Sequence, residues 1–288
     1  MPLLSLALLL AACTVAPDAG PAAPDPVDPA GDYEAALTAL LEDVVSADGL
    51  VDYGRLAGAR ADDFAAVLAA VEQFDAAALT TDAEKLAFFL NAYNVRMLKN
   101  ILDAPEVENI ETDDRFGAFF RTPFRVAGFD MTLNQIENGI LRLQDSVDGQ
   151  PLPEGLRALR PSALDPRLHV GLNCAAVSCP RLRREAFTPE RVDEQLDAAL
   201  SDFADDDRFA TVDGSTITLT TLLDWFGEDF DASGQPVGDF FLAAMSPSRP
   251  GYATLRPILE GRDAVALRTY VLGTPGVSFV YDWTVNRQ

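Results

Sequence analysis

The chain contains a single histidine, His169, which stands five residues before Cys174. Any step that needs an imidazole as base, nucleophile or ligand must use this residue. Asn173-Cys174 follows a predicted strand and precedes small residues, so the thiol of Cys174 is expected at a helix amino terminus, where peptide dipoles and a nearby imidazolium favour the thiolate. The pattern predicts Cys174 as nucleophile and His169 as base, with Asn173 in the same site. The alternative is a hydrogen-bonded core histidine.

Cys174 and Cys179 are the two cysteines outside the N-terminal segment, and their spacing also permits a disulfide. In one continuous helix the pair would be separated by about 7.5 Å along the axis, too far for a bridge, whereas a loop would allow it. The apolar segment 168–172 is expected to be a strand, on which His169 and Cys174 would face opposite sides. A His169–Cys174 dyad therefore requires the backbone to turn near Asn173.

Three further polar residues lie on predicted helices. Glu137 stands among apolar residues and is the carboxylate expected to orient His169; as alternatives it is exposed or pairs with Arg142. Asn91 and Asn94 share one face of a very apolar helix and need buried partners. They either donate to an oxyanion or hold a loop in place, and the second role is favoured.

A metal site is a weaker option. His169, Cys174 and Cys179 with Glu137 or Asp165 would make four ligands, but the spacing is not that of structural zinc sites. No nucleotide-binding or redox C-x-x-C motif occurs. No metal and no cofactor are predicted. The sequence Tyr-Asp-Trp at 281–283 is expected in the core or along a cleft.

Composition bounds the function classes. The 288 residues are 48% hydrophobic and 23% charged, as in globular proteins. A formal net charge of -23 repels phosphate backbones, so no nucleic-acid partner is expected. No apolar run reaches the roughly twenty residues of a spanning helix, which excludes an integral channel or transporter. The expected partner is an unknown small-molecule or peptide-like substrate.

The N-terminal segment predicts the location. Residues 1–12 form an apolar run of signal-peptide length, and Leu-Ala-Ala-Cys at 10–13 is similar to a bacterial lipobox, which implies a lipid anchor on Cys13. Thr14 after this cysteine favours the outer membrane, with the protein periplasmic or surface-exposed. Residues 13–31 are rich in Pro, Ala and Asp and are expected to be a linker, so the membrane is contacted through the lipid alone. An ordinary buried N-terminal segment is the alternative, since no Lys or Arg precedes the run.

Residues 32–288 are expected to form one globular domain. Apolar spacing and capping patterns predict helices at 32–46, 61–74, from Thr81, after Thr132, at 188–203, 222–226 and 240–245. Hairpins are predicted at 124–131 and 209–219, and strands at 168–172 and 277–283. This mixed order indicates an α+β fold, a helix-rich single domain around a small mixed or antiparallel sheet.

Four segments together carry a family resemblance: 86–94, 136–142, 165–180 and 281–283. They resemble the DUF547 family of uncharacterised proteins, over most of the chain from about Gly49 to the end. Phe89 and Ala175 stand where that family often has Trp and Gly. The resemblance implies a domain and site positions without an established reaction. Two hypotheses stay open: a lipid-anchored thiol-dependent hydrolase or acyl transferase, and a disulfide-stapled, non-catalytic envelope binding or scaffolding module.

Overall fold

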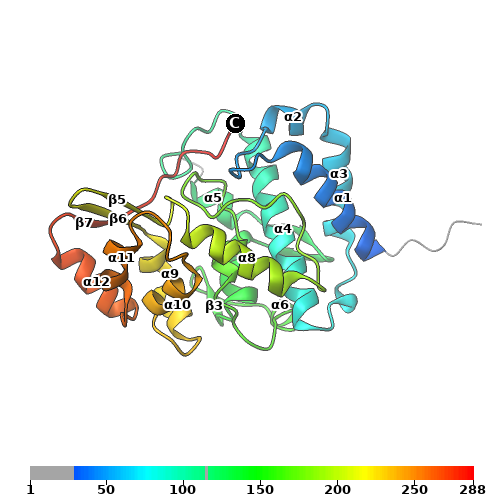
Figure 1. The fold of residues 1–288 in the computed structure, drawn as a ribbon. Helices are drawn as coiled ribbons and strands as arrows, with labels where there is room; N and C mark the ends of the chain where they lie inside the picture. Colours follow the sequence, from blue (N-terminus) through cyan, green and yellow to red (C-terminus); the bar gives the residue numbers. More distant parts are fainter. Residues whose placement is uncertain (1–28, 114–115) are drawn as a thin grey trace, which may run out of the picture.

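Helices build the N-terminal part of this computed structural model, which describes residues 29–113 and 116–288. They are α1 (Pro29–Val44), α2 (Tyr53–Ala57), α3 (Ala61–Gln73), the short 3-10 helix η1 (Ala76–Ala78) and α4 (Asp82–Asp103). The predicted capping box opens α4: the Glu84 N–H donates to Thr81 Oγ1, and the Thr81 N–H donates to Glu84 Oε2. Helix α4 then runs through the middle of the molecule (Figure 1), and most of its residues are buried.

The middle of the chain contains short elements: α5 (Phe116–Arg121), β1 (Phe124–Val126), β2 (Phe129–Met131), the π-helix η2 (Gln135–Leu141), β3 (Ser146–Val147), β4 (Gln150–Pro151) and α6 (Glu154–Arg157). The predicted hairpin is confirmed: β1 and β2 pair antiparallel around Ala127 and Gly128, which both have positive φ. The predicted cap is also present, since the Gln135 N–H donates to Thr132 Oγ1 at 3.1 Å. The helix that follows is a π-helix, a form often found at functional sites.

The segment predicted as a strand at 168–172 is instead the short helix α7 (Leu168–Gly171). Asp165 starts it, because its carbonyl accepts from the Leu168 N–H at 3.1 Å and its side chain accepts from the Arg167 N–H at 2.9 Å. All residues of α7 are buried, which explains why the segment is apolar apart from His169. The backbone becomes extended at Leu172, so the chain does turn just before Asn173.

The C-terminal part combines a sheet with helices: α8 (Val192–Ala204), β5 (Ala210–Asp213), β6 (Thr216–Thr220), α9 (Leu222–Asp231), α10 (Val237–Ala244), α11 (Tyr252–Leu259), α12 (Ala264–Gly273) and β7 (Val277–Val280). The sheet has the order β5-β6-β7, with β5 antiparallel and β7 parallel to β6. Helices α9 to α12 lie beside it (Figure 1). The predicted hairpin at 209–219 and the mixed sheet are confirmed, but the last strand ends at Val280.

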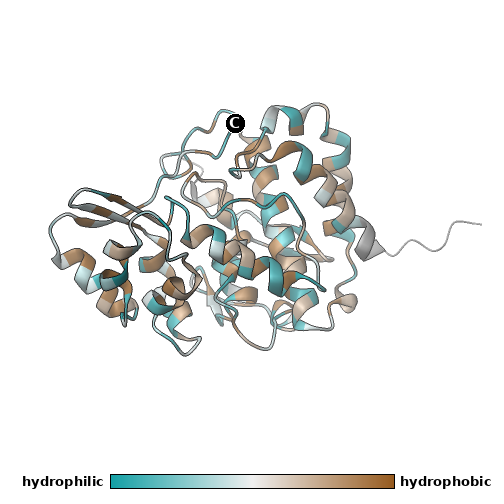
Figure 2. Cartoon of the chain, in the orientation of Figure 1, coloured by the Kyte–Doolittle hydropathy of each residue, from teal (hydrophilic) through white to brown (hydrophobic). Residues whose placement is uncertain are grey.

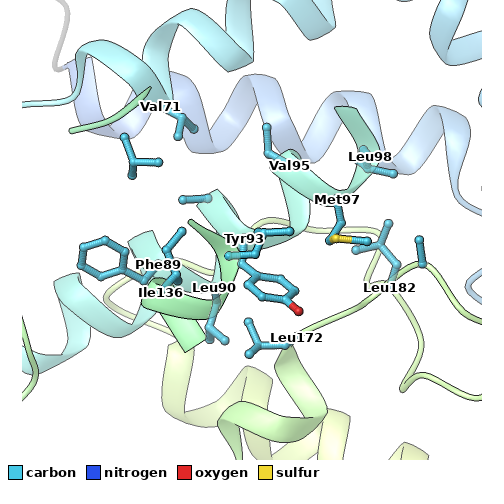
Figure 3. Close-up of a cluster of buried hydrophobic side chains, with 14 of the residues drawn as sticks. Val71, Phe89, Leu90, Tyr93, Val95, Met97, Leu98, Ile136, Leu172 and Leu182 are labelled. Atoms are coloured by element: carbon cyan, nitrogen blue, oxygen red, sulfur yellow. The ribbon is translucent and has the colours of Figure 1, made fainter. Parts of the chain in front are cut away.

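Buried residues form two clusters that meet at α7. Leu168 belongs to the cluster built around α1, α3 and α4, and Val170 belongs to the cluster of the C-terminal part. The helices carry hydrophilic and hydrophobic residues on different sides (Figure 2). Figure 3 shows part of the first cluster, with the ring of Tyr93 beside Leu172. The α+β class and the helix-rich single domain are confirmed by this arrangement.

The predicted signal segment 1–12, Cys13 and most of the linker 13–31 lie outside the described residues. Helix α1 begins at Pro29, inside the predicted linker and ahead of the predicted helix start. Across 29–113 and 116–288, the helices are all too short or too polar to cross a membrane.

Candidate functional site

A cavity of about 260 Å³ brings four of the predicted site residues together: Glu137, His169, Cys174 and Cys179. It lies between η2, α7 with the loop that follows it, α9 and the segment after β7. Its lining includes aromatic rings, polar side chains and both internal cysteines: Tyr93, Phe120, Asn134, Glu137, Asn138, His169, Leu172, Cys174, Cys179, Pro180, Leu222, Trp225, Phe226, Tyr281 and Trp283. On a strand His169 and Cys174 would face opposite sides. Here both line one cavity, because His169 lies on a helix and the chain turns after it.

Three aromatic rings form one wall of this cavity. The ring centroids of Tyr281 and Trp283 are 4.6 Å apart, those of Trp225 and Tyr281 are 4.9 Å apart, and those of the two indoles are 5.7 Å apart. Both tryptophans of the chain are therefore in this site. Trp225 is 42% exposed, so the wall reaches solvent. Because the rings contact each other, they form a continuous surface with no gap for a ligand between them.

Glu137 is the acidic group of the cavity. Its carboxylate accepts a hydrogen bond of 3.1 Å from the hydroxyl of Tyr93. Burial raises the pKa of Glu137, and the positive charge of Arg142 and the Tyr93 hydroxyl only partly oppose this shift. Burial and the nearby Glu137 also raise the pKa of Tyr281, which keeps its hydroxyl protonated. The site thus favours the neutral form of this carboxyl group more than water does.

Asp229, and not Glu137, is the carboxylate that orients His169. The distance from His169 Nε2 to Asp229 Oδ2 is 2.7 Å, and the same oxygen accepts from Arg142 Nε at 2.5 Å. The imidazole stacks on Phe226 with the ring centroids 4.0 Å apart. This corrects the expectation that Glu137 would hold His169. It also corrects the alternative of a Glu137–Arg142 pair, because Arg142 lies against Asp229.

Burial and hydrogen bonding together set the charges of His169 and Asp229. Burial lowers the pKa of His169, and the hydrogen bond with Asp229 only partly opposes the shift. Burial alone would raise the pKa of Asp229, but the hydrogen bonds from His169 and Arg142 hold it below its usual value. A neutral imidazole therefore donates its Nε2 proton to a charged carboxylate, and Nδ1 keeps the lone pair.

Cys174 and Cys179 form a disulfide, with their Cα atoms 6.2 Å apart. The two cysteines lie on a loop, as the sequence spacing required for a bridge. Cys174 is therefore not a free thiol in this structure. Tyr281 places its hydroxyl oxygen 3.0 Å from Cys174 Sγ and 3.1 Å from Cys179 Sγ. The contact of Cys174 Sγ is with this phenol, whereas His169 Nε2 binds Asp229.

The two asparagines of α4 hold the loop that carries the cysteines. Asn94 donates to the Gly171 carbonyl at 2.9 Å and accepts from the Asn173 N–H at 2.8 Å. Asn91 donates to the Phe187 carbonyl at 2.8 Å and accepts from the Phe187 N–H at 2.9 Å. Both side chains are buried; Asn94 binds backbone at the start of the cysteine loop, residues 171–180, and Asn91 binds backbone beyond its end. These contacts favour the loop-holding role over an oxyanion role.

Asn173 organises the same loop from inside. Its amide donates to the Pro180 carbonyl at 2.8 Å, and its oxygen accepts from the Ala175 N–H at 2.9 Å and from the Asn286 amide at 3.2 Å. Ala175 has a φ of 62°, a left-handed conformation that favours glycine. Asn173 is therefore a positioning residue for the loop, and its side chain is occupied by protein partners.

Sequence reasoning missed Asp229, Tyr93 and the wall residue Trp225. Asp229 lies 60 positions from His169 and no spacing rule joins them. Helix α9 gave no clear signal either, because Asp229 is one of four acidic residues in its ten positions. Among residues 29–113 and 116–288, no group of three or more His, Cys, Asp and Glu side chains is placed to hold a metal ion.

Comparison with known proteins identifies the middle of the chain. Residues 77–204 match the family model described as "Protein of unknown function, DUF547". The matched range contains three of the four segments that carried the resemblance, together with Glu137, His169 and both cysteines of the disulfide. Neither the curated proteins nor the solved structures gave a match. Residues 77–204 of this chain are thus a DUF547 domain of unknown function.

Proposed function

We propose that the protein is a disulfide-stapled binding module of the bacterial cell envelope, anchored by a lipid on Cys13, whose cavity binds a single saccharide ring. The envelope location rests on the apolar run 1–12 and the lipobox-like residues around Cys13. The binding role rests on one observation: a continuous aromatic wall and a protonatable Glu137 line the same cavity.

The aromatic wall and the polar lining residues suggest the ligand class. An aromatic wall stacks well against a flat, weakly polar face, and polar groups elsewhere in the lining are available for hydrogen bonds at the ligand edge. A saccharide ring has both a flat, weakly polar face and hydroxyl groups at its edge. The wall residues Trp225, Tyr281 and Trp283 contact each other, so they do not surround a space for a quaternary ammonium group.

The volume limits the size of the ligand. Pockets for drug-sized molecules usually measure roughly 300–1,000 Å³. The cavity here is smaller, at about 260 Å³. It therefore suits one ring, with any further rings of a longer saccharide lying over the exposed indole of Trp225.

Calorimetric titration tests this proposal with glucose, galactose, N-acetylglucosamine and the β-1,4-linked dimers of glucose and N-acetylglucosamine as probes. We expect saturable binding of at least one probe, lost in Trp225→Ala and weakened in Glu137→Gln. Leu272→Ala is the matched control, because Leu272 is 72% exposed on α12 and does not line the cavity. Absence of binding by every probe to the wild-type protein would refute the saccharide assignment.

A thiol-dependent hydrolase or acyl transferase is the second candidate, favoured by the shared cavity of His169 and Cys174. It requires the disulfide to open first. Iodoacetamide labelling of the native protein with peptide mass mapping separates the two: the binding module predicts labelling of Cys174 only after reduction. Selective labelling of Cys174 without reductant would favour the enzyme.

Metabolic labelling with a fatty acid tests the anchor. A bacterial host that expresses the full chain should incorporate labelled palmitate into the wild-type protein and not into Cys13→Ala. Equal labelling of both proteins would remove the lipid anchor from the proposal.

A further inference from the structure

We infer that the Cys174–Cys179 disulfide is a redox centre that exchanges with a low-molecular-weight thiol in the cavity, an activity beyond ligand binding. Both sulfur-bearing residues line the cavity. They differ in access: Cys174 is partly exposed, whereas Cys179 is only 3% exposed. An incoming thiolate therefore meets Cys174 first.

The surroundings of Cys179 suit a leaving thiolate. Its sulfur accepts the backbone N–H of Cys174 at 3.0 Å and lies 3.1 Å from the hydroxyl oxygen of Tyr281. Hydrogen-bond donors lower the pKa of a thiol, and a thiol of lower pKa leaves faster in exchange. Two donors are thus already in place where negative charge develops when the disulfide opens.

The loop is built to survive the opening of its disulfide. Asn173 donates to the carbonyl of Pro180, which closes the loop by a hydrogen bond that does not involve sulfur. Asn94 holds the first residues of the loop, and Asn91 holds the backbone at Phe187, beyond its end. A purely structural disulfide would be the main link across its loop. Here the hydrogen bond from Asn173 to Pro180 is a second link.

The reaction balances with two molecules of a thiol, RSH. The first thiolate forms a bond to Cys174 Sγ while the Cys174–Cys179 bond breaks, and the electron pair and a proton end on Cys179 Sγ. A second thiolate then attacks the sulfur of R in the mixed disulfide and releases RSSR, and Cys174 takes the remaining proton. The disulfide of the protein is reduced to two thiols, and two RSH are oxidised to RSSR.

Glutathione is the probe for the test. Native protein is incubated with reduced and oxidised glutathione, quenched with acid, alkylated and mapped by peptide mass spectrometry. We expect a glutathione adduct on Cys174 in the native wild-type protein. Cys179→Ser should accumulate this adduct, and Cys174→Ser should form an adduct on Cys179 about tenfold more slowly, because that sulfur is buried.

Tyr281→Phe tests the leaving-group argument, with Tyr270→Phe as the control because Tyr270 lies on α12 and does not line the cavity. Loss of one donor to a developing charge should slow exchange about tenfold in Tyr281→Phe and leave Tyr270→Phe unchanged. Equal rates in the two variants would overturn the assignment of Tyr281.

Reduction that occurs only after unfolding in urea, or an adduct that forms first on Cys179, would overturn the redox centre itself. Because the readout is the adduct and not ligand affinity, failure here leaves the saccharide proposal standing. Likewise, absence of saccharide binding would leave the redox proposal standing.

Discussion

Replacing Asn94 by alanine should loosen the cysteine loop, residues 171–180, more than an equivalent change elsewhere on α4. Asn94 makes two hydrogen bonds to this loop: its amide donates to the Gly171 carbonyl and its oxygen accepts from the Asn173 N–H. Alanine makes neither bond. The substitution leaves one backbone acceptor and one backbone donor without their partner at a buried position.

The expected size follows from these two groups. Each buried backbone group that loses its partner costs about 1–3 kcal/mol, so Asn94→Ala should lower the free energy of unfolding by roughly 2–6 kcal/mol. Asn100→Ala is a matched control on the same helix, because Asn100 is also buried and donates to a single backbone group, the Phe119 carbonyl at 2.8 Å. Its expected cost is about 1–3 kcal/mol.

Urea unfolding followed by circular dichroism measures the difference, and amide hydrogen exchange locates it. Asn94→Ala should be the less stable variant and should speed exchange at residues 171–180, whereas Asn100→Ala should leave these amides protected. The argument is refuted if Asn100→Ala costs as much as Asn94→Ala, or if faster exchange in Asn94→Ala is spread evenly along the chain.

Three further substitutions test the site and its support. Burial raises the folded-state pKa of Glu137, so ionisation opposes folding and stability falls as the pH rises above the ordinary Glu pKa; Glu137→Gln should therefore lose less melting temperature than the wild type as the pH is raised from about 4, and an equal loss would contradict the shift. Gly171→Ala would bring a Cβ atom to 2.9 Å from Leu196 Cδ2, which should cost about 1–3 kcal/mol in urea unfolding; unchanged stability would show that α7 has room there. Asp229→Asn removes the carboxylate that opposes the effect of burial on His169, so NMR titration should find the imidazole pKa lower than in wild type, and a higher value would refute the assignment.

Local signals in the sequence predicted local structure well. The capping box of Thr81 and Glu84 and the turn at Ala127-Gly128 involve residues within a few positions of each other, so their hydrogen bonds and dihedral angles depend little on the rest of the fold. The same holds for the hairpin around Gly214, which also has positive φ. Such elements can be read from one sequence because their causes are adjacent in it.

The prediction of a strand at 168–172 was wrong for a physical reason. A short apolar run is compatible with a buried strand and with a buried helix, and periodicity cannot separate them. Here every residue of α7 is buried between the two hydrophobic clusters, so its apolar residues lie on more than one face and show no helical period. Asp165-Pro166 before it was the available signal for a helix start, since Asp is a good cap and Pro suits a first turn.

The partner of His169 could not be found in the same way. The sequence offered Glu137 because it was the carboxylate in a recognisable motif, but hydrogen bonding depends on which helix packs beside α7. Helix α9 supplies Asp229 there, together with Phe226 against the imidazole ring. This pairing depends on the packing of the C-terminal part, for which the sequence carries no short-range signal.

Residues that follow the DUF547 match complete the site. The last segment pairs with the cysteine loop, because the Val177 N–H donates to the Thr284 carbonyl at 2.8 Å and the Asn286 N–H donates to the Ala175 carbonyl at 2.9 Å. This pairing places Tyr281 on both sulfurs. The matched region 77–204 supplies the acid, the imidazole and the disulfide, whereas residues beyond it supply the aromatic wall and the carboxylate that fixes His169. It follows that a protein with the same motif but a different C-terminal segment would keep the acid, the imidazole and the disulfide but lose the aromatic wall and the carboxylate that fixes His169.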